Sequence, residues 1–172
     1  MEDRRRQRLE ALFVEHGAAV RAYVLRRGDP ADADDVVMEV FVIACRRLGE
    51  MPVEPLPWLL GCARRILANR RRGARRARAL IEKLSLTIAG PEHGTGVAEM
   101  LAGALNALSE TDREVLLLAA WEGLAPSQIA QVVGCSRTAA AVRLHRARRR
   151  LRTAMSGAEA VPARKPAAEV LR

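Results

Sequence analysis

The chain has 172 residues, of which 49% are hydrophobic and only 3% are aromatic. This apolar content suffices for one or two packed domains and argues against wholesale disorder, while the scarcity of aromatics favours helices over a β-sandwich. The net charge of +9 favours an anionic partner such as nucleic acid.

Arginine carries almost all of this positive charge. Lys83 and Lys165 are the only lysines among the 29 basic residues. A G+C-rich genome accounts for much of the preference for arginine over lysine. It does not account for the excess of charge or for its clustering, and arginine suits nucleic acid because it binds phosphate bidentately and stacks on bases.

Three separate cysteines, Cys45, Cys62 and Cys135, lie in apolar helical patterns. Their odd number and wide spacing predict reduced thiols in or near the core, with no metal and no cofactor. The charged start of the chain is followed by no apolar run approaching about 18 residues. We therefore expect no signal peptide, no membrane insertion and a cytoplasmic protein.

The first half of the chain predicts a helical bundle over residues 5–84. Apolar residues recur at helical spacing, Gly28 and the prolines of segment 49–57 interrupt the pattern, and Asp29-Pro30 is a typical helix start. The expected helices run, in chain order, from Arg5 to Arg27, from Asp29 to Leu48 and from Trp58 to Leu84.

The second expected helix begins with a run of acids that is unusual in so basic a chain. Valines and Phe41 occupy one face, and Asp32, Asp35 and Glu39 occupy another. Acids near a helix N-terminus are favoured by the helix dipole. By itself the pattern therefore fits a solvated surface and a protein-docking face about equally well.

The third expected helix becomes strongly basic after its apolar start. Eight arginines fall between residues 64 and 78. Like charges three and four residues apart repel along a helix, so an anionic partner would stabilise this segment. A solvated basic face or a patch for RNA or acidic lipid is the plainer alternative, although few bulky apolar residues follow Leu67 to enter a membrane.

A glycine- and proline-containing segment, residues 85–96, predicts a flexible linker to a second domain over residues 97–155. Residues 156–172 are rich in Ala, Pro and Gly, which predicts a disordered tail. The overall expectation is an all-α protein with two small helical domains: an N-terminal bundle and a C-terminal helix-turn-helix domain.

Segment 124–146 carries the clearest local motif. Ile129, Ala130 and Val133 would face inward from a short helix, Gly134 allows a sharp turn, and a second helix follows. In a helix-turn-helix the start of the second helix enters the major groove and later arginines contact phosphate. A plain helical hairpin with a basic face is the alternative.

Taken together, these segments resemble the bacterial RNA polymerase sigma factors, specifically the extracytoplasmic-function (ECF) group of the sigma-70 family. The resemblance covers about residues 9–152. Its parts are the acidic helix at 32–44, the segment Pro57-Trp-Leu-Leu-Gly-Cys-Ala-Arg with the arginines after it, and the helix-turn-helix with its flanks from Leu108-Ser-Glu-Thr-Asp-Arg-Glu to Leu144-His-Arg-Ala-Arg.

The resemblance implies a function and a set of site residues. The protein would bind core RNA polymerase, direct promoter-specific transcription initiation and have an anti-sigma factor. The loop 49–57 would close over a flipped base of the minus-ten element. The implied polymerase-binding residues are Asp32, Asp35, Val36, Glu39 and Val40. The implied minus-ten residues are Arg65, Asn69, Arg71, Arg72, Arg75 and Arg76. The implied helix-turn-helix contacts are Ser127, Gln128, Ser136, Arg137, Thr138, Ala139, Arg143 and Arg146.

The sequence departs from the usual pattern of the family at three places. Met38 stands where Gln is usual, Arg65 stands where Asn is frequent, and an Ala-rich stretch at 139–142 replaces more polar residues. The main alternative is a helix-turn-helix regulator that binds DNA without polymerase, followed by a basic RNA-binding protein. An enzyme ranks last, because the three histidines lie in unrelated segments and no nucleophile or phosphate-loop motif occurs.

Overall fold

The computed structural model describes residues 2–82 and 97–159, and every regular element in those two stretches is helical. The α-helices are α1 (Glu2–Leu25), α2 (Ala33–Arg46), α3 (Pro55–Glu82), α4 (Val97–Asn106), α5 (Glu110–Ala120), α6 (Pro126–Val133) and α7 (Arg137–Glu159). The all-α prediction is confirmed. The predicted linker, residues 85–96, lies outside the described residues.

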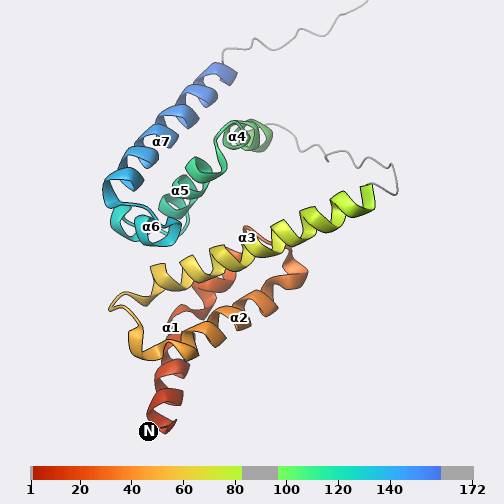
Figure 1. Cartoon of the computed structure of the whole chain (residues 1–172). Coiled ribbons are helices and arrows are strands. Elements are labelled where there is room, and N and C mark those ends of the chain that lie inside the picture. The colour runs from red at the N-terminus through yellow and green to blue at the C-terminus, as the bar shows by residue number, and fades with distance from the viewer. Residues whose placement is uncertain (1, 83–96, 160–172) are drawn as a thin grey trace, which may run out of the picture.

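Helices α1, α2 and α3 pack against one another to form the first unit (Figure 1). Its core is built from fully buried side chains on each helix, including Val20 and Tyr23 of α1, Val36 of α2, and Leu59 and Leu60 of α3. Burying a Leu or Val stabilises the fold by about 1.5–3 kcal/mol per side chain. This apolar face is what holds the arginine-rich α3 in place.

The loop before α3 is shorter than the prolines predicted. A 3-10 turn occupies Leu48–Glu50, and α3 begins at Pro55 rather than at Trp58. The first N–H groups of a helix have no intrahelical partner, so proline is accepted there. Pro55 and Pro57 thus start the helix instead of preventing it.

Helices α4 to α7 form the second unit, and local caps and turns set the ends of these helices. Ser109 Oγ accepts a hydrogen bond from Asp112 N at 3.1 Å and caps α5. Gly134 has φ +73° at the end of α6, a left-handed conformation that favours glycine. Helix α7 runs to Glu159, so residues 156–159 are helical, contrary to the prediction of a disordered tail from 156. The rest of that tail lies outside the described residues.

The two units are in contact with each other. Helix α6 crosses α3, and one cluster of buried apolar side chains includes residues of both units. The crossing is close at Gly61, where an added Cβ would lie 3.7 Å from the Cα of Val132. Figure 1 shows α6 lying against the first half of α3.

Within the described ranges, no helix combines the length and the apolar character needed to cross a membrane.

Candidate nucleic-acid interface

Helices α6 and α7 form the predicted helix-turn-helix. Ile129, Ala130, Ala140 and Leu144 are buried between them, whereas Val142 points outward. Ser136 Oγ accepts a hydrogen bond from Ala139 N at 3.1 Å and caps α7. The small residues Ala130 and Ala140 let the two helices cross closely, which fixes the angle at which α7 is presented.

The predicted contact residues of this motif lie mostly on its surface. Arg137, Thr138 and Arg146 are exposed, and Ala139 and Arg143 are half-buried. Gln128 is engaged within the protein: its Oε1 accepts a hydrogen bond from Ala125 N at 2.9 Å, and its Nε2 donates to Glu54 Oε2 at 2.8 Å. Ser127, beside it, is exposed.

The predicted minus-ten residues all lie on the surface of α3, but not all on one side of the helix. Arg65, Asn69, Arg71, Arg72, Arg75 and Arg76 are all exposed. Two of them hold each other, since Arg72 Nη2 donates to Asn69 Oδ1. Arg71 reaches the second unit, where its Nη1 donates to Glu110 Oε1 at 3.1 Å. Arg65 and Asn69 line a pocket on the α2 side of α3, whereas Arg71 lines a pocket between α1, α3 and the second unit, so α3 is basic on more than one side.

The acidic start of α2 faces solvent beside α3. Asp32, Asp35 and Glu39 are exposed. Arg70 of α3 lies between two of them, with Nη1 3.3 Å from Asp32 Oδ1 and Nη2 3.6 Å from Glu39 Oε2. These exposed pairs contribute little to stability.

Two residues assigned to that face lie elsewhere. Val36 and Val40 have 0% exposed surface and pack in the core, because α2 turns their side chains toward α1 and α3. They support the face from behind and offer no surface to a partner. Met38, 65% exposed, and Val42, 42% exposed, are the apolar residues of α2 on the open side. Helical spacing from Asp35 would have found Met38 and Val42.

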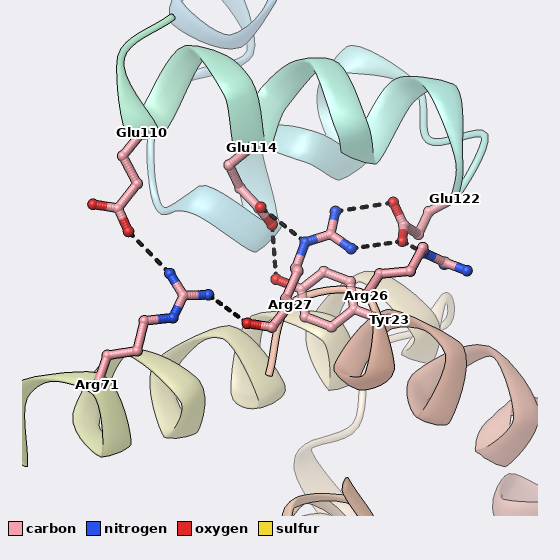
Figure 2. Close-up of polar contacts among 7 residues, drawn as sticks. All are labelled: Tyr23, Arg26, Arg27, Arg71, Glu110, Glu114 and Glu122. Atoms are coloured by element: carbon pink, nitrogen blue, oxygen red, sulfur yellow. Dashed lines mark hydrogen bonds and ion pairs between the residues drawn. The ribbon is translucent and has the colours of Figure 1, made fainter. Parts of the chain in front are cut away.

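A cluster of charged and polar side chains joins the two units, and the sequence analysis does not predict it. We call it the interunit ion-pair cluster: Tyr23, Arg26, Arg27 and Arg71 of the first unit with Glu110, Glu114 and Glu122 of the second (Figure 2). No sequence motif marks it, because the side chains that it bonds across the two units are 39 to 96 residues apart in the sequence.

Arg27 is the centre of this cluster. Its Nε donates to Glu114 Oε2 at 2.9 Å, its Nη1 and Nη2 donate to Glu122 at 3.0 and 3.2 Å, and its Cζ lies 3.9 Å from the centre of the Tyr23 ring. The side chains of Arg27 and Glu122 are only 5% and 4% exposed. Burial alone would lower the pKa of Arg27, but the neighbouring carboxylates outweigh it and raise that pKa. A buried pair of this kind is costly to break, because one charge would stay buried alone.

Tyr23 reports on the same contact. Its hydroxyl donates to Glu114 Oε1 at 2.7 Å, and burial together with the charge of Glu114 raises the pKa of the phenol well above its ordinary value. The uncharged phenol is therefore favoured in the closed structure. The uncharged phenol of Tyr23 contributes fully to the stability of the closed structure below the ordinary tyrosine pKa near 10. This contribution is lost as the pH rises through the raised pKa of Tyr23.

Tyr23 is the only tyrosine of the chain, so its ionisation is directly measurable. We expect the tyrosinate absorbance band to stay absent at pH values well above 10 in the wild type and to appear near pH 10 in Glu114→Ala combined with Glu122→Ala, which removes the acceptor and opens the contact that buries the phenol. A wild-type titration midpoint near 10 would show that the phenol is not held as the structure has it.

Comparison with known proteins identifies the family of the chain. The Sigma-70 region 2 family matches residues 12–77, and the Sigma-70 region 4 family matches residues 98–151. The chain is 31% identical over 162 residues to the ECF RNA polymerase sigma factor SigL of Mycobacterium tuberculosis, covering 84% of this chain and 86% of SigL. The chain belongs to the ECF sigma factors of the sigma-70 family. It is a sigma factor that directs transcription initiation.

Other relatives agree in sequence and fold. The RNA polymerase sigma factor NccH of Alcaligenes xylosoxydans is 31% identical over 157 residues, which are 81% of this chain and 82% of NccH. The structure of CnrH in complex with the cytosolic domain of CnrY matches with a TM-score of 0.60 and 26% identity, over 87% of this sigma factor and 88% of CnrH. RpoE of Bartonella quintana, solved in complex with the anti-sigma factor NepR, shares the fold with a TM-score of 0.62 at 22% identity, over 86% and 96% of the two chains.

The match to both regions settles the choice between the two leading hypotheses. A helix-turn-helix regulator would account for residues 98–151 and leave the first unit unexplained, whereas this sigma factor matches its family along both units. Sigma factors are generally initiation factors without an enzymatic activity of their own.

Proposed function

We propose that the exposed face of α2 binds core RNA polymerase. Asp32, Asp35 and Glu39 supply charge there, and Met38 and Val42 supply apolar surface between them. An interface needs both a desolvated apolar centre and a charged rim, and this face has that composition. Replacement of the usual Gln by Met38 makes the centre more apolar.

We infer that promoter DNA binds along the outer side of α3 and at the start of α7. The exposed arginines of α3 suit the phosphates and unstacked bases of a melted minus-ten element. The capped, solvent-facing start of α7 suits the major groove of the minus-thirty-five element. With Ala139 and Ala141 in place of longer side chains, Arg137, Thr138 and Arg143 are the main candidates for base contact.

The contact between the two units limits how this protein can bind a promoter. Two elements roughly 25 base pairs apart lie roughly 85 Å apart along B-DNA. In the structure α6 packs directly on α3, Gln128 is bonded to Glu54, and Arg71 is bonded to Glu110. A chain in this closed form cannot hold both elements at once. We therefore propose that the interunit ion-pair cluster opens before the protein engages a promoter.

The remaining expectations follow from the family. We propose that the protein works in the cytoplasm, where its polymerase is, and that an anti-sigma factor restrains it, as CnrY and NepR are found bound to CnrH and RpoE. The exposed face of α2 is available for such a partner in the closed form.

One prediction concerns the recognition helix. Arg143→Ala should weaken binding to the upstream element by about 1–3 kcal/mol if the side chain reads a base edge, and should relax the sequence preference at one position. Binding of holoenzyme to a set of promoters with single changes measures both effects. Uniform weakening at every sequence would make Arg143 a phosphate contact instead.

The proposed function is tested by adding the purified protein to core RNA polymerase and transcribing a library of genomic fragments. We expect copurification with the polymerase and transcripts that appear only when the protein is present. DNA binding without polymerase association would contradict the assignment of α2.

A further inference from the structure

A second basic surface lies at the opposite end of the first unit from the interunit ion-pair cluster. A groove of about 1040 Å³ opens between the start of α1 and the end of α2. Six arginines line it: Arg4, Arg5, Arg6, Arg8, Arg46 and Arg47. None of the residues at the start of α1 belongs to the polymerase or promoter contacts assigned above.

The groove keeps its positive charge in the structure. Among the residues whose side chains the structure describes, Glu50 is the one acid that lines it, and Arg6 is paired with Glu10 at 2.8 Å. Arg5 Nη2 donates to Cys45 O at 3.1 Å, so it ties the start of α1 to the end of α2 and fixes the two walls. Like charges gathered around one groove repel one another, so a polyanion bound between them would be favoured.

The groove continues into the minus-ten surface. A neighbouring pocket of about 450 Å³ between α2 and α3 is lined by Arg65 and Asn69, two of the proposed minus-ten residues, and by Arg46 and Arg47, which also line the groove. A strand that passes Arg65 therefore meets Arg46 and Arg47 next and then the arginines of α1. Leu9 and Leu48 give the groove an apolar floor that suits sugars and base edges.

The order of the elements along the chain indicates which end of this basic surface faces upstream and which faces downstream DNA. Along the chain the C-terminal end of α3 comes before the second unit, so in the opened form we expect this end toward the upstream element, although in the closed form α6 lies on the first half of α3. Arg65 and the groove lie toward the N-terminal end of α3. We propose that this groove, between the start of α1 and the end of α2, binds the phosphate backbone of the single-stranded promoter DNA immediately downstream of the minus-ten element. This inference rests on the proposed binding of the minus-ten strand by α3.

The test uses holoenzyme and two forked promoter fragments. In one the single strand ends at the minus-ten element, and in the other it continues about eight nucleotides downstream. The variant is Arg4→Gln with Arg8→Gln, which leaves the Arg5 bond to Cys45 intact. A matched control is Arg21→Gln, which removes an exposed arginine from the same helix, outside the residues that line the groove.

We expect the double variant to bind the extended fork roughly tenfold more weakly at moderate salt and to lower the salt dependence of log Kd by roughly 1.4, since each lost single-strand phosphate contact contributes about 0.7. Binding to the short fork and copurification with core polymerase should be unchanged, and Arg21→Gln should match the wild type.

Three outcomes would overturn the inference. Equal weakening on both forks would mean a general charge effect, no weakening on either would leave the groove without this role, and loss of copurification would place it on the polymerase. Failure of the proposed function is distinguishable from all three, because the wild-type protein would then give no polymerase-dependent binding to either fork.

Discussion

Asp35→Arg combined with Glu39→Arg should abolish binding to core RNA polymerase and leave the fold intact. Both side chains are exposed on α2, so the change reverses two charges on the proposed docking face without entering the core. Like-charge contacts across an interface cost several kcal/mol, enough to weaken binding by two or more orders of magnitude. Pull-down of core polymerase and runoff transcription measure the loss.

A matched control separates the docking face from charge in general. Glu10→Arg with Glu15→Arg reverses two exposed acids of α1 and should retain polymerase binding. Unchanged thermal unfolding of both variants would show that the units remain folded. If the α2 variant still copurifies with polymerase, the assignment of this face is wrong.

Glu114→Ala combined with Glu122→Ala should separate the two units. The change leaves Arg27, 5% exposed, without the two carboxylates that bind it, and removing one side of a buried pair typically costs about 3–5 kcal/mol. Opening returns Arg27 to water and relieves that cost, so the open form should dominate. Small-angle scattering should show a larger radius of gyration, and promoter complexes should form faster.

Glu110→Ala is the matched control for this prediction. Glu110 lies on α5, the helix that also carries Glu114, and its replacement removes an ion pair to Arg71. The Glu110 side chain is 80% exposed, so this pair contributes at most about 1 kcal/mol to stability. Its radius of gyration should stay near that of the wild type. A double variant that remains compact would show that the apolar contact between α3 and α6 holds the units together without the charges.

Much of the fold was predictable because its signals are local. The cap at Asp29 and the turn at Gly134 are each set by a few neighbouring residues, and both lie where predicted, although Asp29 caps a 3-10 turn over Pro30–Asp32 and α2 itself begins at Ala33. The predicted start of α3 at Trp58 is three residues later than the observed start at Pro55, because proline is accepted in the first turn of a helix as well as breaking one.

The candidate site was less predictable where it depends on tertiary packing. A family resemblance marks positions 36 and 40 as part of the docking helix, but only the packing of α2 shows that these valines point inward. The interunit ion-pair cluster and the groove at the start of α1 each combine residues that are distant in sequence. No local pattern links Arg27 to Glu122 or Arg8 to Arg47.

Because of the interunit ion-pair cluster, the fraction of molecules in the open form does not depend on the concentration of the protein. Both halves of the contact belong to one chain, so the ratio of closed to open molecules is the same at every concentration, whereas occupancy by an inhibitor from outside falls on dilution. The apparent affinity for promoter DNA is scaled by the open fraction. Greater synthesis of the protein would multiply the open molecules without changing that fraction, and each change of about 1.4 kcal/mol in the cluster would shift the ratio tenfold.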